Sequence, residues 1–136
     1  MVKVIMGLKG SGKTKQLIDS INSAIKEETG SVVCIEKGKA LTFDVDYRVR
    51  LINASEYDIG SYEFLKGFIS GLHAGNFDIT RIFIDGLYKL AGTDDTAAAA
   101  DFVAWCDAFG KANNMQFTLS ISSDPASLPE SITKYQ

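Results

Sequence analysis

Residues 2–20 read VKVIMGLKGSGKTKQLIDS, and this stretch decides the fold. It begins with a short apolar run, passes through glycines at positions 7, 10 and 12, and continues into a segment where apolar residues recur every three or four positions. An apolar run that ends in a glycine loop is typical of a buried strand, and the spacing after the loop predicts an amphipathic helix from Thr14 to the Thr29-Gly30 pair. A strand, a tight loop and a helix in this order indicate an α/β domain.

The alternation of strands and helices continues through the rest of the chain. Apolar runs predict further strands at 32–35, 49–52, 79–84 and 115–121. Helices are expected from Ser61 to Gly75, from Thr93 or Asp94 to Gly110, and from Pro129 to Tyr135. We therefore expect an α/β fold of three layers with a mainly parallel five-stranded sheet.

Length and composition limit the possible classes of protein. The 136 residues, 46% of them apolar and 23% charged, are typical of one soluble domain, which we expect to span residues 1–136. The net charge of −3 offers no basic excess for binding long nucleic acid. Cys34 and Cys106 lie far apart in a chain with one histidine, so neither a zinc site nor a disulfide framework is expected. No apolar run approaches the ~18 residues of a membrane span, and a cytoplasmic location is expected.

Residues 7–14, GLKGSGKT, match the phosphate-binding pattern G-x-x-x-x-G-K-[ST] in full. At average residue usage this pattern should arise by chance in fewer than roughly one chain in a hundred of this length. Backbone N–H groups of a glycine loop and of a helix N-terminus together present donors to a phosphate chain. The alternative is a glycine-rich turn that carries a solvated lysine.

With this motif between a strand and a helix, the chain resembles the P-loop nucleoside-triphosphate-binding family from Val2 to about Ser122. The family also carries an acidic residue after an apolar strand, and residues 82–85, IFID, match that pattern. The resemblance implies ATP and Mg²⁺ as ligands, with Thr14 and Asp85 holding the metal. A helix cap is the alternative role for Asp85. The residues implied to bind the phosphates are Gly7, Leu8, Lys9, Gly10, Ser11, Gly12, Lys13 and Thr14.

Hydrolysis would require a group that orients the attacking water. Many P-loop ATPases carry a glutamate directly after the strand acid, but this chain has Gly86 there. A branch resembling RecA places that glutamate at the end of the strand after the P-loop helix, and Glu36 stands at this position. The resemblance implies that Glu36 and Lys13 are catalytic; a surface acid that ends a strand is the other interpretation of Glu36. Asp44 and Asp46 are weaker candidates.

The RecA resemblance also implies a sheet order of 3-2-4-5-1, with the fifth strand between the first and the fourth. Ser120 and Ser122 would then end near the γ-phosphate as polar sensors. The alternation of apolar and polar residues in 115–121 argues against a central position, because alternating strands are more often half exposed. Arg48 and Arg50 are expected on one side of a strand as solvated charges, with an arginine supplied to a neighbouring subunit as the alternative.

These observations predict an Mg-ATP-binding protein with slow ATPase activity that works through a protein partner or self-assembly. The chain is similar to small ATP-binding proteins of Gram-positive bacteria. One alternative is a nucleoside kinase, because the arrangement also resembles type II thymidine kinases, although the cysteine quartet of their zinc lasso is missing. The other is an ATP-dependent switch without hydrolysis. No [NT]-K-x-D motif that would read guanine occurs in the second half of the chain.

Overall fold

The computed structural model describes residues 1–136 as one five-stranded sheet in which every strand pairing is parallel. Its strands are β1 (Val2–Gly7), β2 (Ser31–Glu36), β3 (Arg50–Asn53), β4 (Ile79–Ile84) and β5 (Gln116–Ser122). The order across the sheet is β1-β5-β4-β2-β3. A sheet can be read from either edge, and from β3 this order is 3-2-4-5-1, with β5 between β1 and β4.

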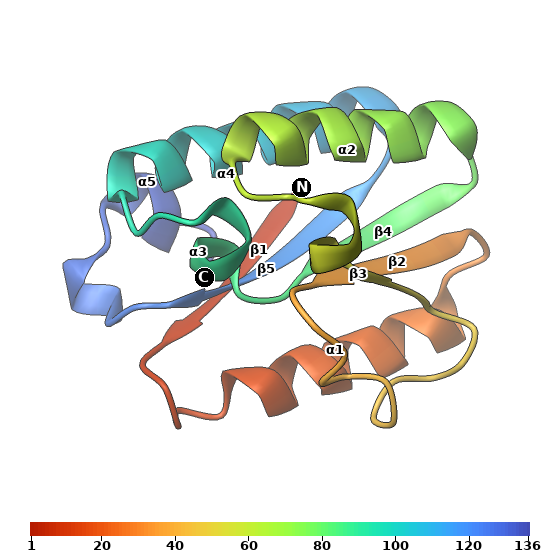
Figure 1. Cartoon of the computed structure of the whole chain (residues 1–136), viewed down its shortest axis with the longest axis horizontal. Coiled ribbons are helices and arrows are strands. Elements are labelled where there is room, and N and C mark those ends of the chain that lie inside the picture. Colours follow the sequence, from red (N-terminus) through yellow and green to blue (C-terminus); the bar gives the residue numbers. More distant parts are fainter.

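Helices cover both faces of the sheet (Figure 1). Helix α1 (Lys13–Glu27) lies on one face, and α2 (Tyr62–Gly75) and α4 (Thr96–Asn113) lie together on the other. Two short helices, α3 (Leu87–Ala91) and α5 (Glu130–Thr133), complete the α2–α4 side. None of these helices combines the length and apolarity needed to cross a bilayer.

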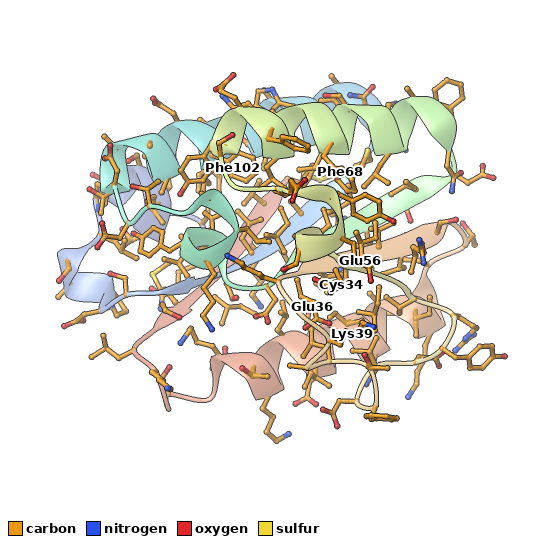
Figure 2. All side chains as sticks on the ribbon, in the orientation of Figure 1. Cys34, Glu36, Lys39, Glu56, Phe68 and Phe102 are labelled. Carbon is orange, nitrogen blue, oxygen red and sulfur yellow. The ribbon has the colours of Figure 1, made fainter.

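The core is divided by the sheet into two clusters. Val33 and Ile35 of β2 belong to the cluster under α2 and α4, whereas Val32 and Cys34 belong to the cluster under α1. This division follows from the period-two geometry of a strand, which sends alternate side chains to opposite faces. In Figure 2, Phe102 lies in the helical layer of α2 and α4. Both faces of the sheet are thus covered, as expected for parallel strands.

Strand β5 corrects the expectation that an alternating pattern marks a half-exposed strand. Its polar residues Thr118 and Ser120 are only 5% and 2% exposed, and β5 pairs with neighbours on both sides. Phe117 and Leu119 face the α2–α4 side, so the polar residues face the α1 side. The polar face of β5 is therefore directed inward, not toward solvent.

The structure differs from the expectations in three further places. The segment after β4 contains a helix that the sequence did not predict, α3, bounded by Gly86 and Gly92 in left-handed conformations. Helix α4 begins at Thr96 because the Asp95 side chain accepts hydrogen bonds from the amides of Ala97 and Ala98, and it continues past Gly110 to Asn113. Arg48 lies before β3 and bonds Asp46, so it does not share a strand face with Arg50.

The segment between β2 and β3 is fastened to α1. The Asn22 side chain of α1 donates to the Asp44 carbonyl at 2.9 Å and accepts from the Asp46 amide at 2.9 Å. Three apolar residues of the segment, Leu41, Val45 and Val49, are buried in the α1 cluster. In contrast, Phe43 and Tyr47 are 98% and 92% exposed. The segment is an anchored loop that displays two aromatic side chains.

Candidate functional site

The largest cleft of the molecule lies at the carboxyl ends of the strands. Its volume is about 680 Å³, within the ~300–1,000 Å³ range of ligand pockets. It is lined by residues of the glycine loop, of the start of α1 and of the segments that follow β2, β4 and β5: Lys9, Gly10, Gly12, Lys13, Thr14, Lys37, Ala40, Asp85, Gly86, Lys89, Ser120 and Ser122. In a parallel α/β sheet this edge is the usual place for a ligand.

The glycine loop leads directly into α1. Gly12 is the N-cap of the helix with φ +88°, a left-handed conformation that favours glycine. No side chain caps α1, whereas α2 is capped by Ser61 and α4 by Asp95. The first N–H groups of any helix lack a carbonyl partner within it. Donors at the start of α1 are therefore free for an anion in the cleft.

A row of polar side chains crosses the sheet at this edge. Ile35, Ile84 and Leu119 are aligned in register on β2, β4 and β5. The next residues on these three strands are Glu36, Asp85 and Ser120, and the Asp85 amide donates to the Ile35 carbonyl at 2.9 Å, which continues the alignment. Because the preceding residues face the α2–α4 side, the three polar side chains face the α1 side, which is also where the glycine loop enters α1.

Ser120 is bonded to Asp85. Its hydroxyl donates to Asp85 Oδ1 at 3.0 Å and accepts from the Gly86 amide at 2.8 Å. Both partners belong to the segment that leaves β4, and Ser120 is 2% exposed. The serine that the sequence offered as a sensor thus holds the Asp85 carboxylate in one orientation at the wall of the cleft.

Glu36 lies beside this wall but does not line the cleft. It is 3% exposed, and both carboxylate oxygens lie 3.4 Å from the Leu41 amide. Burial raises the pKa of Glu36, and the nearby Asp85 charge raises it further, while hydrogen bonds from the amides of Leu41 and Ala40 oppose the shift. Figure 2 shows Glu36 at the end of β2. It is a desolvated acid close to the cleft and separated from it by the loop that follows β2.

Four lysines line the cleft, and only one carboxylate, that of Asp85, is among its lining residues. Lys13 Nζ donates to the Leu8 carbonyl at 3.1 Å, and none of the four lysines is in an ion pair. The cleft is therefore strongly positive in a chain whose net charge is −3. Lys37 and Lys89 were missed by sequence reasoning, although both follow closely on the ends of predicted strands, at the edge where a ligand was expected.

Other residues proposed from the sequence lie elsewhere. Among the eight loop residues, Gly7, Leu8 and Ser11 do not line the cleft, whereas the other five do. Neither Asp44 nor Asp46 reaches the cleft. The Arg48 guanidinium lowers the pKa of Asp46 to about 2. No arginine lines the cleft; Arg81 pairs with Glu28 at 2.9 Å, and Arg50 borders a smaller cleft along β3.

The described residues contain no cluster of three or more His, Cys, Asp or Glu side chains that could hold a metal ion alone. Thr14 and Asp85 nevertheless line the same cleft. This donor set suits Mg²⁺, which typically takes one or two protein oxygens and fills its shell with phosphate oxygens and water. Thr14 and Asp85 would supply two of the ligands, and phosphate oxygens and water would supply the others.

Comparison with known proteins adds no assignment: no family model matches the sequence, and no curated protein matches it.

Proposed function

We propose that this chain is a P-loop nucleotide-binding protein with a RecA-like arrangement, and that it binds Mg-ATP and hydrolyses it slowly. One observation carries the proposal: the uncapped start of α1 and four unpaired lysines border the same cleft. A polyphosphate is the ligand that matches this arrangement, because free helix amides and ammonium groups both favour oxyanions. The strand order, with β5 between β1 and β4, supports the RecA comparison.

In the proposed complex the amides of Gly12 and of the first turn of α1 bind phosphate oxygens together with Lys13. Thr14 and Asp85 hold the metal, which supplies charge neutralisation on the phosphate chain. Ser120 keeps the Asp85 carboxylate oriented through its 3.0 Å hydrogen bond. These residues bind and orient the nucleotide; none of them activates water.

Glu36 is proposed to orient the attacking water. A carboxyl whose pKa is raised by burial is a better proton acceptor than an exposed one. Its contact with the Leu41 amide is long, 3.4 Å to each oxygen, and holds the side chain weakly. Turnover requires the carboxylate to leave Leu41 and turn into the cleft. This requirement supports slow hydrolysis.

Titration calorimetry with ATP in the presence of Mg²⁺ tests the binding proposal, and phosphate release tests hydrolysis. We expect saturable binding by the wild type and by Glu36→Gln, with phosphate release only by the wild type. Asp44→Asn is the matched control, because Asp44 is an exposed carboxylate outside the cleft. Wild-type protein without affinity for Mg-ATP would refute the proposal, and equal turnover by Glu36→Gln would remove Glu36 from it.

The output of the nucleotide-bound state is proposed to lie in a protein partner or in a second copy of the chain. The support is the anchored loop, which exposes Phe43 and Tyr47 and starts at the cleft residue Lys37. Exposed apolar side chains mark sites of protein association when they form a contiguous patch, and both aromatic residues are carried by this one loop. Sedimentation with and without Mg-ATP tests self-association directly.

The two alternative functions make different predictions. A nucleoside kinase would form a nucleoside monophosphate when thymidine or another nucleoside is added with ATP. A switch would change its oligomer size or its partner binding with ATP and release negligible phosphate. Chromatography of the reaction products, together with the sedimentation experiment, separates both from the slow ATPase.

A further inference from the structure

We infer that the cleft selects its ligand by the number of phosphates and not by the base, so that nucleoside triphosphates and inorganic tripolyphosphate form one ligand class. The inference rests on the proposed function, because it assumes that the cleft binds a polyphosphate. It goes further because it names the chemical group that the cleft recognises. It also assigns contact with the terminal phosphate to two lysines, Lys37 and Lys89.

The lining of the cleft offers nothing that would recognise a purine or pyrimidine. Ala40 is the one apolar residue among the residues that line it, and no aromatic side chain is present. Nucleotide-binding pockets hold bases by stacking on aromatic or apolar side chains and by specific hydrogen bonds. Here lysines, glycines and hydroxyl groups make up most of the wall. Such a wall recognises phosphate oxygens and leaves the base in solvent.

The lysines occupy two ends of the cleft. Lys9 and Lys13 belong to the glycine loop and the start of α1, next to β1. Lys89 lies in α3, which follows β4, and Lys37 follows β2. In the sheet, β4 and β2 are separated from β1 by β5, so these two lysines lie on the other side of β5 from the glycine loop. Asp85, the proposed metal ligand, directly follows β4. A phosphate chain that starts at the glycine loop and extends toward Asp85 brings its terminal phosphate to Lys37 and Lys89.

No arginine is available for this role, since none of the three in the chain lines the cleft. Lys37 and Lys89 have no ion-pair partner. The stem of Lys89 packs against Gly86, with Cδ 3.6 Å from the position that a Cβ at Gly86 would occupy. A side chain at position 86 would make ordinary van der Waals contact with this stem, but it would have to adopt an unfavourable φ of +73°. The backbone conformation after Asp85 therefore favours glycine, and the Lys89 stem packs directly on it.

The test is a competition series in which a fluorescent ATP analogue is displaced by unlabelled ligands at constant Mg²⁺ and ionic strength. ATP, GTP, CTP and inorganic tripolyphosphate should have dissociation constants within about fivefold of one another, because they share the charged part that is bound. ADP should bind about tenfold more weakly and AMP more weakly again, because each step removes one phosphate contact with a charged partner.

The variants Lys37→Met and Lys89→Met test whether these two lysines contact the terminal phosphate. Each should weaken ATP and tripolyphosphate about tenfold while leaving the ADP constant within about twofold. Lys39→Met is the control, because Lys39 lies on the same loop as Lys37 but borders the smaller cleft along β3. Circular dichroism on all three variants verifies that they are folded.

Several outcomes overturn the inference. Strong preference for ATP over GTP, CTP and tripolyphosphate would show that the base is read. Equal losses of ATP and ADP binding in Lys37→Met and Lys89→Met would show that these lysines do not contact the terminal phosphate. Absence of binding by every phosphate ligand would instead refute the proposed function itself, so the two failures are distinguishable.

Discussion

The Ser120 hydroxyl donates to Asp85 Oδ1 at 3.0 Å and at the same time accepts from the Gly86 amide at 2.8 Å. It joins β5, which lies between β1 and β4 in the sheet, to the segment that leaves β4. A buried hydroxyl that satisfies both a carboxylate and a backbone amide fixes the position of each. The orientation of Asp85 is therefore determined by a neighbouring strand and not by the loop that carries it.

Replacing Ser120 with alanine should affect both stability and metal use. The Gly86 amide would lose its partner, so the free energy of unfolding should fall by about 1–3 kcal/mol in urea titrations. Nucleotide binding should weaken in the presence of Mg²⁺ and change little in its absence, since Asp85 would lose its orientation. Ser127→Ala is the control, because Ser127 is exposed and lies outside the cleft. If Ser120→Ala weakened nucleotide binding equally with and without Mg²⁺, Ser120 would not act through the proposed metal ligand Asp85.

Lys13→Ala should abolish ATP binding without unfolding the protein. Lys13 has one hydrogen bond in this structure, to the Leu8 carbonyl, so its loss should change the free energy of unfolding by no more than about 0.5 kcal/mol. Lys15→Ala is the control, because Lys15 lies outside the cleft and pairs with Asp19 on the exposed face of α1. Calorimetry that finds normal ATP affinity in Lys13→Ala would contradict the assigned role.

Glu36→Gln should stabilise the protein at neutral pH. The pKa of Glu36 is raised in the folded state, chiefly by burial, so folding favours the protonated form. The contribution of this group is fully present below the unfolded pKa of about 4.3 and is lost as the pH rises through the folded pKa. The variant should therefore exceed the wild type in stability at pH 7.

Urea titrations at pH 4 and pH 7 verify the sign. The stability difference between wild type and Glu36→Gln should shrink at the lower pH, where Glu36 is mostly protonated in both the folded and the unfolded chain. Glu63→Gln, an exposed carboxylate on α2, should show no comparable change. A variant less stable than wild type at pH 7 would mean that the Glu36 charge is compensated by its surroundings.

Cys34 and Cys106 should be inert in the folded protein. Both are fully buried, and burial raises the pKa of each thiol far above its usual range. Because the thiolate is the reactive form, disulfide-exchange reagents should label the native protein at least about 100-fold more slowly than the unfolded chain. The check is to count thiols before and after adding denaturant. Fast labelling of Cys34 in the native state would show that the α1 side of the sheet opens.

The sequence predicted the strands well, because their apolar runs are short, continuous and bounded by polar or glycine residues. The expected start of α2 at Ser61 was also correct, since Ser61 caps this helix and its hydroxyl accepts from the Phe64 amide at 3.0 Å. Helix α3 was missed because five residues are too few to show a helical period. The start of α4 was misplaced because Thr93, Asp94 and Asp95 are all good caps, and only the structure shows which one bonds the helix.

The candidate site shows a different limit. The glycine loop and Asp85 carry local patterns, and both line the cleft. Lys37 and Lys89 carry no pattern, because a lysine after a strand usually points to solvent. Only the sheet order places them opposite the glycine loop. The alternation in β5 also led to the wrong expectation of a half-exposed strand. A buried polar face that supports a site has the same alternating sequence as a solvent-exposed polar face.

Helix α1 contacts two separate parts of the molecule. Its first turn borders the cleft, and Asn22, further along the same helix, hydrogen-bonds the loop backbone at Asp44 and Asp46. If a ligand in the cleft displaces this first turn, we expect the displacement to reach the segment that carries Phe43 and Tyr47 through the Asn22 hydrogen bonds. The proposed anion site and the exposed side chains Phe43 and Tyr47 are therefore connected through a single helix.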